Sequence, residues 1–116
     1  MATFMFVFRG GAFVQPGLSP AEMGAHLQKW TDWIGGLAKS GVHEGGHAVQ
    51  GAGKTVRGTR RTVTDGPYAE AKDLVTGNLV IAAASLEEAT RIATDCPIFE
   101  FDGSVEVRPI LEREGM

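Results

Sequence analysis

The apolar segment at residues 4–8, Phe-Met-Phe-Val-Phe, constrains the fold more than any other part of the chain. Successive side chains of a β-strand point to opposite faces. Phe4, Phe6 and Phe8 therefore share one face, and Met5 and Val7 share the other. A strand that is apolar on both faces is typical of a sheet that is covered on both sides.

The first helix has clear start and stop signals. Ser19 is a good N-cap, Pro20 suits the first helical position, and Glu22 completes a capping box. Gly41 marks the stop. Apolar residues recur between these points at helical spacing, which predicts a buried stripe: Met23, Leu27, Trp30, Ile34 and Leu37.

A second helix is predicted by the same signals. Ser85 is its N-cap and Glu88 follows three residues later. We expect it to end at Pro97, because proline cannot continue a helix. Its predicted buried stripe consists of small and branched apolar residues: Leu86, Ala89, Ile92, Ala93 and Cys96.

Three further segments read as strands. Residues 55–64 alternate as a polar strand, an exposed hairpin arm, and residues 79–84 form a central strand. Residues 105–108 form the last strand. The order strand, helix, two or three strands, helix, strand predicts one domain over residues 1–116 with an α+β, ferredoxin-like sandwich. Its two helices cover one face of an antiparallel sheet, so the other face needs a partner, and we expect a homodimer.

Composition excludes several classes of function. The chain has 116 residues and a net charge of −3, so it has no overall basic field for nucleic acid or anionic membrane. No apolar run approaches the ~20 residues of a membrane span. The N-terminus lacks the basic region of a secretory signal. The lone Cys96 cannot form an internal disulfide, and we expect it to be a buried small hydrophobe in a cytoplasmic protein.

His43-Glu44-Gly45-Gly46-His47 matches the zinc-protease pattern H-E-x-x-H. That chemistry needs both histidines on one continuous helix. The two central glycines disfavour a helix by about 2 kcal/mol relative to alanine. We therefore predict no integral metal ion.

Residues 51–55, Gly-Ala-Gly-Lys-Thr, imitate the end of a phosphate-binding P-loop. The full pattern requires glycine where Ala48 stands, and a helix directly after the threonine. A polar strand follows instead, without a helix N-terminus to hold phosphate. No cofactor motif survives, and we predict no cofactor.

Asp65 is the leading candidate for a functional carboxylate. It precedes Gly66 and Pro67, which together predict a rigid corner. A carboxylate held there can act as a general base or anchor a substrate donor. It can equally cap the turn by accepting backbone hydrogen bonds. Further candidates for ligand binding are Arg9, Trp30, Tyr68, Glu70, Lys72 and Arg108.

The stretch around Asp65, Asp-Gly-Pro-Tyr-Ala-Glu-Ala-Lys-Asp at residues 65–73, resembles the signature of the YCII-related family. The resemblance is to the branch named for its Asp-Gly-Pro-Phe motif, with Tyr68 in place of phenylalanine. It continues through residues 77–81, 86–89 and 105–109. It implies a ferredoxin-like fold and a dimer of the α/β-barrel type, with two sheets packed face to face.

The same resemblance bears on His26. Several YCII-related proteins carry a histidine on the first helix that pairs with an aspartate as an acid–base dyad. That position falls near Trp30 here, and His26 lies about one turn away. His26 is therefore a weak catalytic candidate, and a half-exposed helix histidine is the alternative.

Three functions remain open from the sequence. The first is binding of a small ligand in a pocket between sheet and helices, followed, if the protein is an enzyme, by cofactor-free acid–base chemistry such as an elimination or isomerisation. The second, which the resemblance suggests, is a regulatory module linked to extracytoplasmic-function sigma factors. The third is a cofactor-independent oxygenase of the same dimeric fold.

Overall fold

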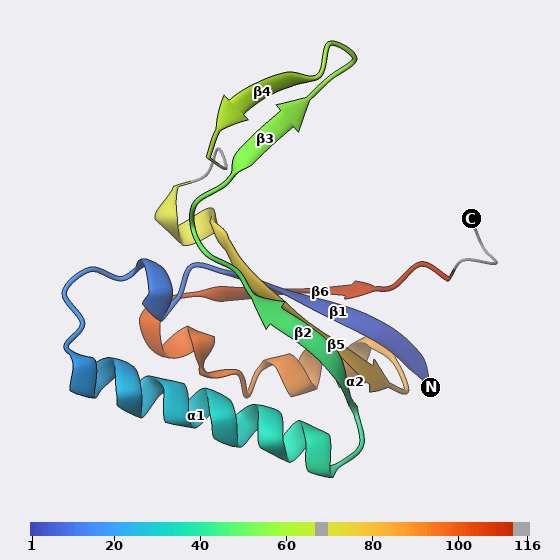
Figure 1. Ribbon diagram of the computed structural model, residues 1–116. Coiled ribbons are helices and arrows are strands. Elements are labelled where there is room, and N and C mark those ends of the chain that lie inside the picture. The colour runs from blue at the N-terminus through green and yellow to red at the C-terminus, as the bar shows by residue number, and fades with distance from the viewer. Residues whose placement is uncertain (67–69, 113–116) are drawn as a thin grey trace.

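Both helices lie on one face of a four-stranded antiparallel sheet (Figure 1). The computed structural model describes residues 1–66 and 70–112. The strand order in the sheet is β2-β5-β1-β6, which confirms the predicted ferredoxin-like fold. The elements are β1 (Ala2–Arg9), α1 (Pro20–Lys39), β2 (His43–Ala48), β3 (Lys54–Arg57), β4 (Thr62–Asp65), β5 (Val75–Ala83), α2 (Leu86–Ala93) and β6 (Ser104–Pro109), with short 3-10 turns η1 (Ala12–Val14), η2 (Ala71–Asp73) and η3 (Pro97–Phe101).

The core lies between the helices and the sheet, and β1 supplies its centre. Phe4, Phe6 and Phe8 are all buried on this face, as the alternation predicts. The ring of Phe6 stacks on Trp33 of α1 with centroids 6.3 Å apart. Leu79 and Ile81 of β5 are buried beside them.

The ends of α1 confirm the predicted capping. The Ser19 side chain accepts a hydrogen bond from the Glu22 backbone N–H, and the Glu22 carboxylate accepts one from the Ser19 N–H. After the helix ends, Gly41 adopts a left-handed conformation with φ +79°. Among the described residues, no helix is both long and apolar enough to cross a membrane.

Helix α2 also begins at its predicted cap, Ser85, but it ends earlier than predicted. Its last residue is Ala93, whereas the sequence suggested an end at Pro97. The residue before a proline is driven out of the helical region by the proline ring. Cys96 accordingly has an extended backbone, and Pro97 begins the short 3-10 turn η3.

In the described residues, four strands lie between the helices, one more than the sequence suggested. The strand that the sequence missed is β2, which pairs with β5 at the edge of the sheet. The predicted polar arm is present as β3 and β4, which within residues 1–66 and 70–112 pair only with each other. We call residues 54–65 the arm. It rises on the opposite side of the main sheet from the helices (Figure 1).

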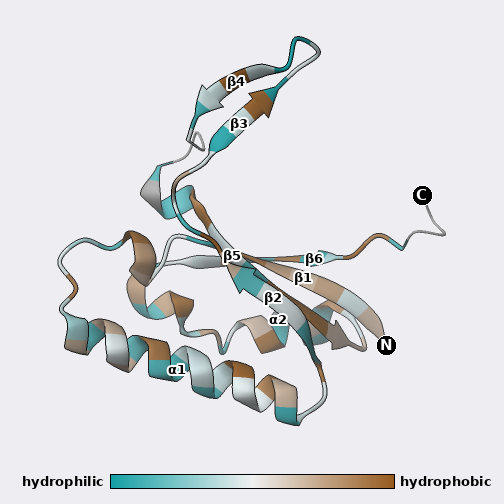
Figure 2. Cartoon of the chain, in the orientation of Figure 1, coloured by the Kyte–Doolittle hydropathy of each residue, from teal (hydrophilic) through white to brown (hydrophobic). Residues whose placement is uncertain are grey.

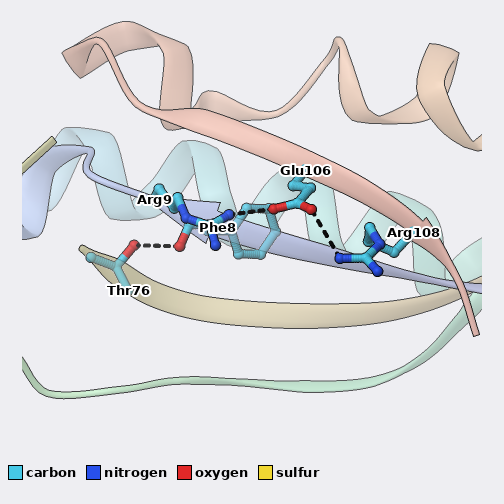
Figure 3. Close-up of polar contacts among 5 residues, drawn as sticks. All are labelled: Phe8, Arg9, Thr76, Glu106 and Arg108. Carbon is cyan, nitrogen blue, oxygen red and sulfur yellow. Dashed lines mark hydrogen bonds and ion pairs between the residues drawn. The ribbon is translucent and has the colours of Figure 1, made fainter. Parts of the chain in front are cut away.

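The second face of the main sheet, which we call the open face, is the one that the helices do not cover. Met5 and Val7 of β1 and Val80 of β5 lie on it, and each is only half-buried. Glu106 of β6 accepts hydrogen bonds there from Arg9 at 2.5 Å and Arg108 at 3.1 Å (Figure 3). These bonds, that of Arg9 foremost, hold the pKa of Glu106 below its ordinary value.

Cys96 is buried, as predicted, and it should not react as a thiol in the folded protein. Burial raises its pKa to about 12, so the nucleophilic thiolate is almost absent at neutral pH. Labelling with a thiol reagent at pH 8 should be negligible until denaturant is added, and then reach one group per chain. Rapid labelling of the native protein would contradict this prediction.

Candidate active site

A cavity of about 340 Å³ opens between α1 and the sheet. Leu27, Trp30 and Ile34 of α1 line one side of it, and Phe8 and Leu79 line the other. The predicted apolar stripe of α1 therefore faces the cavity for part of its length, which explains why Leu27 remains 41% exposed. An apolar cavity of this size with a few polar groups is typical of a small-molecule site.

Glycines of two neighbouring strands form part of the cavity wall. Gly46 of β2 and Gly77 of β5 both line it. A Cβ on Gly77 would lie 2.8 Å from the carbonyl oxygen of His47. A Cβ on Gly46 would lie 2.8 Å from the Cα of Leu79. Only glycine fits these two positions without moving the backbone of the adjoining strand.

His26 is the polar group most deeply set in this wall. It projects from α1, is only 1% exposed and lines the cavity. Its Nδ1 lies 3.0 Å from Oε1 of Glu100, and its Nε2 accepts a hydrogen bond from the Trp30 indole N–H at 2.9 Å. The ring of Phe101 meets the imidazole edge-to-face at 4.8 Å. The expectation of a half-exposed histidine was wrong.

These two hydrogen bonds define the state of the imidazole. An indole nitrogen can only donate, so Nε2 of His26 must be the unprotonated nitrogen. Nδ1 then carries the proton and donates it to Glu100. The result is a neutral imidazole whose proton-accepting nitrogen is Nε2 and whose orientation is fixed by a carboxylate.

Glu100, on η3, is held ionised by two donors. Lys29 of α1 bonds to its second oxygen, and His26 bonds to the first. The hydrogen bond from Lys29, followed by that from His26, keeps the pKa of Glu100 below its ordinary value. A carboxylate that stays charged can stabilise the imidazolium that forms when His26 takes up a proton.

Of the residues predicted from the sequence, the structure brings His26 and Trp30 together at the cavity. The sequence analysis missed Glu100. The one feature of the sequence that points to Glu100 is that its carboxylate interrupts the otherwise apolar residues of η3.

The residues of the predicted corner lie elsewhere. Asp65 ends β4 with its side chain 92% exposed, and it pairs with Lys54 at 2.6 Å. Glu70 and Lys72 are exposed near η2. None of these three lines the cavity of its own chain. Tyr68 lies outside the described residues.

Arg9 and Arg108, the predicted cationic candidates, both bond to Glu106 on the open face. Neither lines the cavity. β1 and β6 are neighbours, and β6 is an edge strand of the described sheet. Thr76 is the polar residue that ties this end of β1 to β5, through hydrogen bonds to the carbonyls of Phe8 at 3.4 Å (Figure 3) and Gly10 at 3.1 Å.

The H-E-x-x-H segment is a strand rather than a helix. His43 and His47 lie at its two ends, on β2. Both line the cavity, so all three histidines of the chain border this one space. The P-loop-like segment leads into β3, so no helix follows its lysine and threonine.

This fold and cavity define an α+β, ferredoxin-like protein with a small-molecule-sized space beside a buried histidine. The chain belongs to the YCII-related family, whose domain profile matches residues 19–114. The comparison with curated proteins gives no match.

One similar solved structure is 5-chloro-2-hydroxyhydroquinone dehydrochlorinase (TftG) from Burkholderia phenoliruptrix AC1100, in complex with 2,5-dihydroxybenzoquinone. The identity is 16%, the TM-score is 0.55, and the alignment covers 96% of each chain. At this identity the likeness shows the fold alone.

Proposed function

We propose that this protein is a cofactor-free acid–base enzyme that acts on a small, ring-sized organic molecule by elimination or isomerisation. The observation that carries the proposal is the arrangement of His26, a neutral buried imidazole fixed by a charged carboxylate at the wall of an apolar cavity. The dehydrochlorinase named above supports the reaction class, because loss of a chloride is an elimination.

In the proposed reaction, Nε2 of His26 removes a proton from a carbon or a hydroxyl oxygen of the bound molecule. In an elimination, the electron pair left behind forms a new π bond, directly or through the conjugated ring of a dienone tautomer, and the leaving group departs from a tetrahedral carbon with its bonding pair. In an isomerisation, His26 returns the proton to a different carbon. Glu100 holds the ring in place and stabilises its protonated form in both cases.

Trp30 has a defined part in this scheme. Its indole N–H occupies Nε2 in the structure, and Trp30 lines the same cavity. A substrate reaches Nε2 by replacing the indole, so ligand binding should perturb Trp30.

The proposal is tested with 5-chloro-2-hydroxyhydroquinone as substrate, by chloride release, and with 2,5-dihydroxybenzoquinone as ligand, by calorimetry. We expect turnover and binding by the unsubstituted protein. His26→Asn keeps a donor near the place of Nδ1 but removes the base, so turnover should fall by about 100-fold or more. Glu100→Gln keeps the size and removes the charge, and it should lower turnover in the same direction.

Asp65→Asn is the matched control, because it also exchanges an acid for its amide. Asp65 and the other corner residues remain proposals for ligand binding from the sequence. On the cavity hypothesis, Asp65→Asn should keep full turnover and an unchanged melting temperature. His26→Asn should lose turnover and still unfold in one cooperative transition, at a somewhat lower melting temperature because the Trp30 N–H loses its acceptor. Loss of turnover in Asp65→Asn with full turnover in His26→Asn would instead assign the active site to the corner at Asp65. Binding that depends on His26 without any turnover would favour the regulatory alternative.

We also propose that the protein is a homodimer whose two copies meet through the open faces of their sheets. The half-buried Met5, Val7 and Val80 on that face support this, because removing apolar side chains from water is favourable in free energy. In the described part of the chain, both helices lie on the other face (Figure 1).

A further inference from the structure

The arm, residues 54–65, has no role in the cavity and stands apart from the rest of the protein. Its strands β3 and β4 pair only with each other among the described residues. The radius of gyration is 15.8 Å, whereas a compact chain of this length has roughly 13 Å. The arm in Figure 1 accounts for this extended shape.

An arm of this kind is poorly suited to stand alone in water. An isolated two-stranded hairpin is marginally stable at best. Val56 and Val63 lie opposite each other in the hairpin and are 64% and 57% exposed. Each strand thus carries a hydrophobic segment among hydrophilic neighbours (Figure 2). Such a cross-strand apolar pair on a projecting element points to a contact with another molecule.

The charge of the arm indicates what that molecule is. The arm contains four basic residues and one acidic residue, a net charge of +3. Because the whole chain carries −3, the remainder carries −6. Arg57, Arg60 and three threonines line a hollow of about 550 Å³ at the end of the arm. The arm is therefore complementary in charge to the body of a second copy of this chain.

The position of the arm leads to the same partner. It rises on the side of the sheet that carries the open face, opposite the helices (Figure 1). A second copy that binds to the open face therefore lies on the same side of the sheet as the arm. We propose that the arm of each copy packs against the acidic body of its partner and clasps the dimer. This inference rests on the homodimer proposed above and adds the element that stabilises it.

The first test removes the arm. The backbone N–H of Gly66 donates to the carbonyl of Gly53 at 2.6 Å, so the two ends of the arm are adjacent. Deletion of residues 54–65 can join these glycines directly. In sedimentation equilibrium we expect the unsubstituted protein to dimerise and the deletion variant to have a dissociation constant at least about tenfold higher. The dimer should also weaken as salt is added.

The second test keeps the arm and changes one charge, in case the deletion variant does not fold. Arg60→Glu reverses a charge on the arm, and Arg91→Glu makes the same change on α2, away from the open face. Arg60→Glu should raise the dimer dissociation constant about tenfold or more, and Arg91→Glu should leave it within about twofold. Hydrogen exchange of the arm amides should slow with increasing concentration only in the protein that dimerises.

These measurements do not depend on catalysis, so they separate this inference from the proposed reaction. If neither the deletion nor Arg60→Glu changes the dissociation constant of the dimer, the proposed clasp is wrong and the proposed homodimer stands. A protein that remains monomeric at all concentrations overturns both. Binding of a labelled DNA duplex by that monomer, abolished by Arg60→Glu, would assign the arm to nucleic acid instead.

Discussion

Phe6→Ala is expected to lower the free energy of unfolding by about 4 kcal/mol, the usual cost of removing a buried phenylalanine ring. Phe6 is 0% exposed and lies at the centre of β1, between two strands of the sheet. Its ring stacks on Trp33 and meets Phe8 edge-to-face at 6.4 Å. The substitution loses the transfer free energy of the ring and leaves a cavity that its rigid neighbours cannot close.

Urea denaturation of both proteins measures this difference. Phe13→Ala is the matched control, because Phe13 is 57% exposed and its removal should change stability by no more than about 0.5 kcal/mol. Equal losses for the two variants would show that the helix-facing side of the sheet does not form the core. A loss below about 1 kcal/mol for Phe6→Ala would lead to the same conclusion.

Local signals in the sequence predicted the framework of this fold well. The caps of both helices depend on residues three positions apart, and both appear where Ser19 and Ser85 indicated. The alternation of β1 likewise identified which phenylalanines are buried. These features succeed because their physical cause lies within a few residues of the chain.

The candidate site could be predicted only in part, because its key pair is not local. His26 and Glu100 are 74 residues apart and meet only when η3 packs beside α1. Nothing near His26 in the sequence shows whether it will be buried. The family resemblance indicated a histidine on this helix, near Trp30, with an aspartate as its partner. The sequence alone could not supply Glu100, the carboxylate that pairs with His26.

Asp65 shows the opposite case. Local sequence predicted a rigid corner here, of which Pro67 lies outside the described residues, and the rigidity of a corner does not show what the corner faces. In the structure Asp65 ends β4 at the base of the arm and pairs with Lys54. If the arm packs against a second copy, the contribution of Asp65 is to tie the two strands of the arm together at their base, through this ion pair.

Strand β2 escaped prediction because its glycines hide any alternation of apolar and polar residues. Those glycines are nevertheless what lets β2 lie close to β5. Gly46 pairs with Leu79 in the register of the two strands. The same close approach shapes the wall of the cavity. The packing of β2 on β5 and the shape of the site therefore both depend on glycine at position 46.

Gly46→Ala is therefore expected to lower the free energy of unfolding by about 4 kcal/mol. About 2 kcal/mol comes from backbone strain, because alanine resists the φ of +155° found at Gly46. About 2 kcal/mol more comes from overlap with the Asn78 carbonyl oxygen and with the Leu79 Cα, which is backbone that cannot turn aside. We expect β2 to move away from β5 and the ligand 2,5-dihydroxybenzoquinone to lose affinity.

Gly45→Ala separates the two causes. Gly45 has nearly the same φ, +157°, but a Cβ there would meet nothing within 4 Å. It should therefore show the strain without the overlap, a loss of about 2 kcal/mol, and it should keep its ligand affinity. Urea denaturation and calorimetry on both variants measure the two effects. If the two substitutions cost the same, the close contact between β2 and β5 at Gly46 does not exist, and the cavity has a different wall.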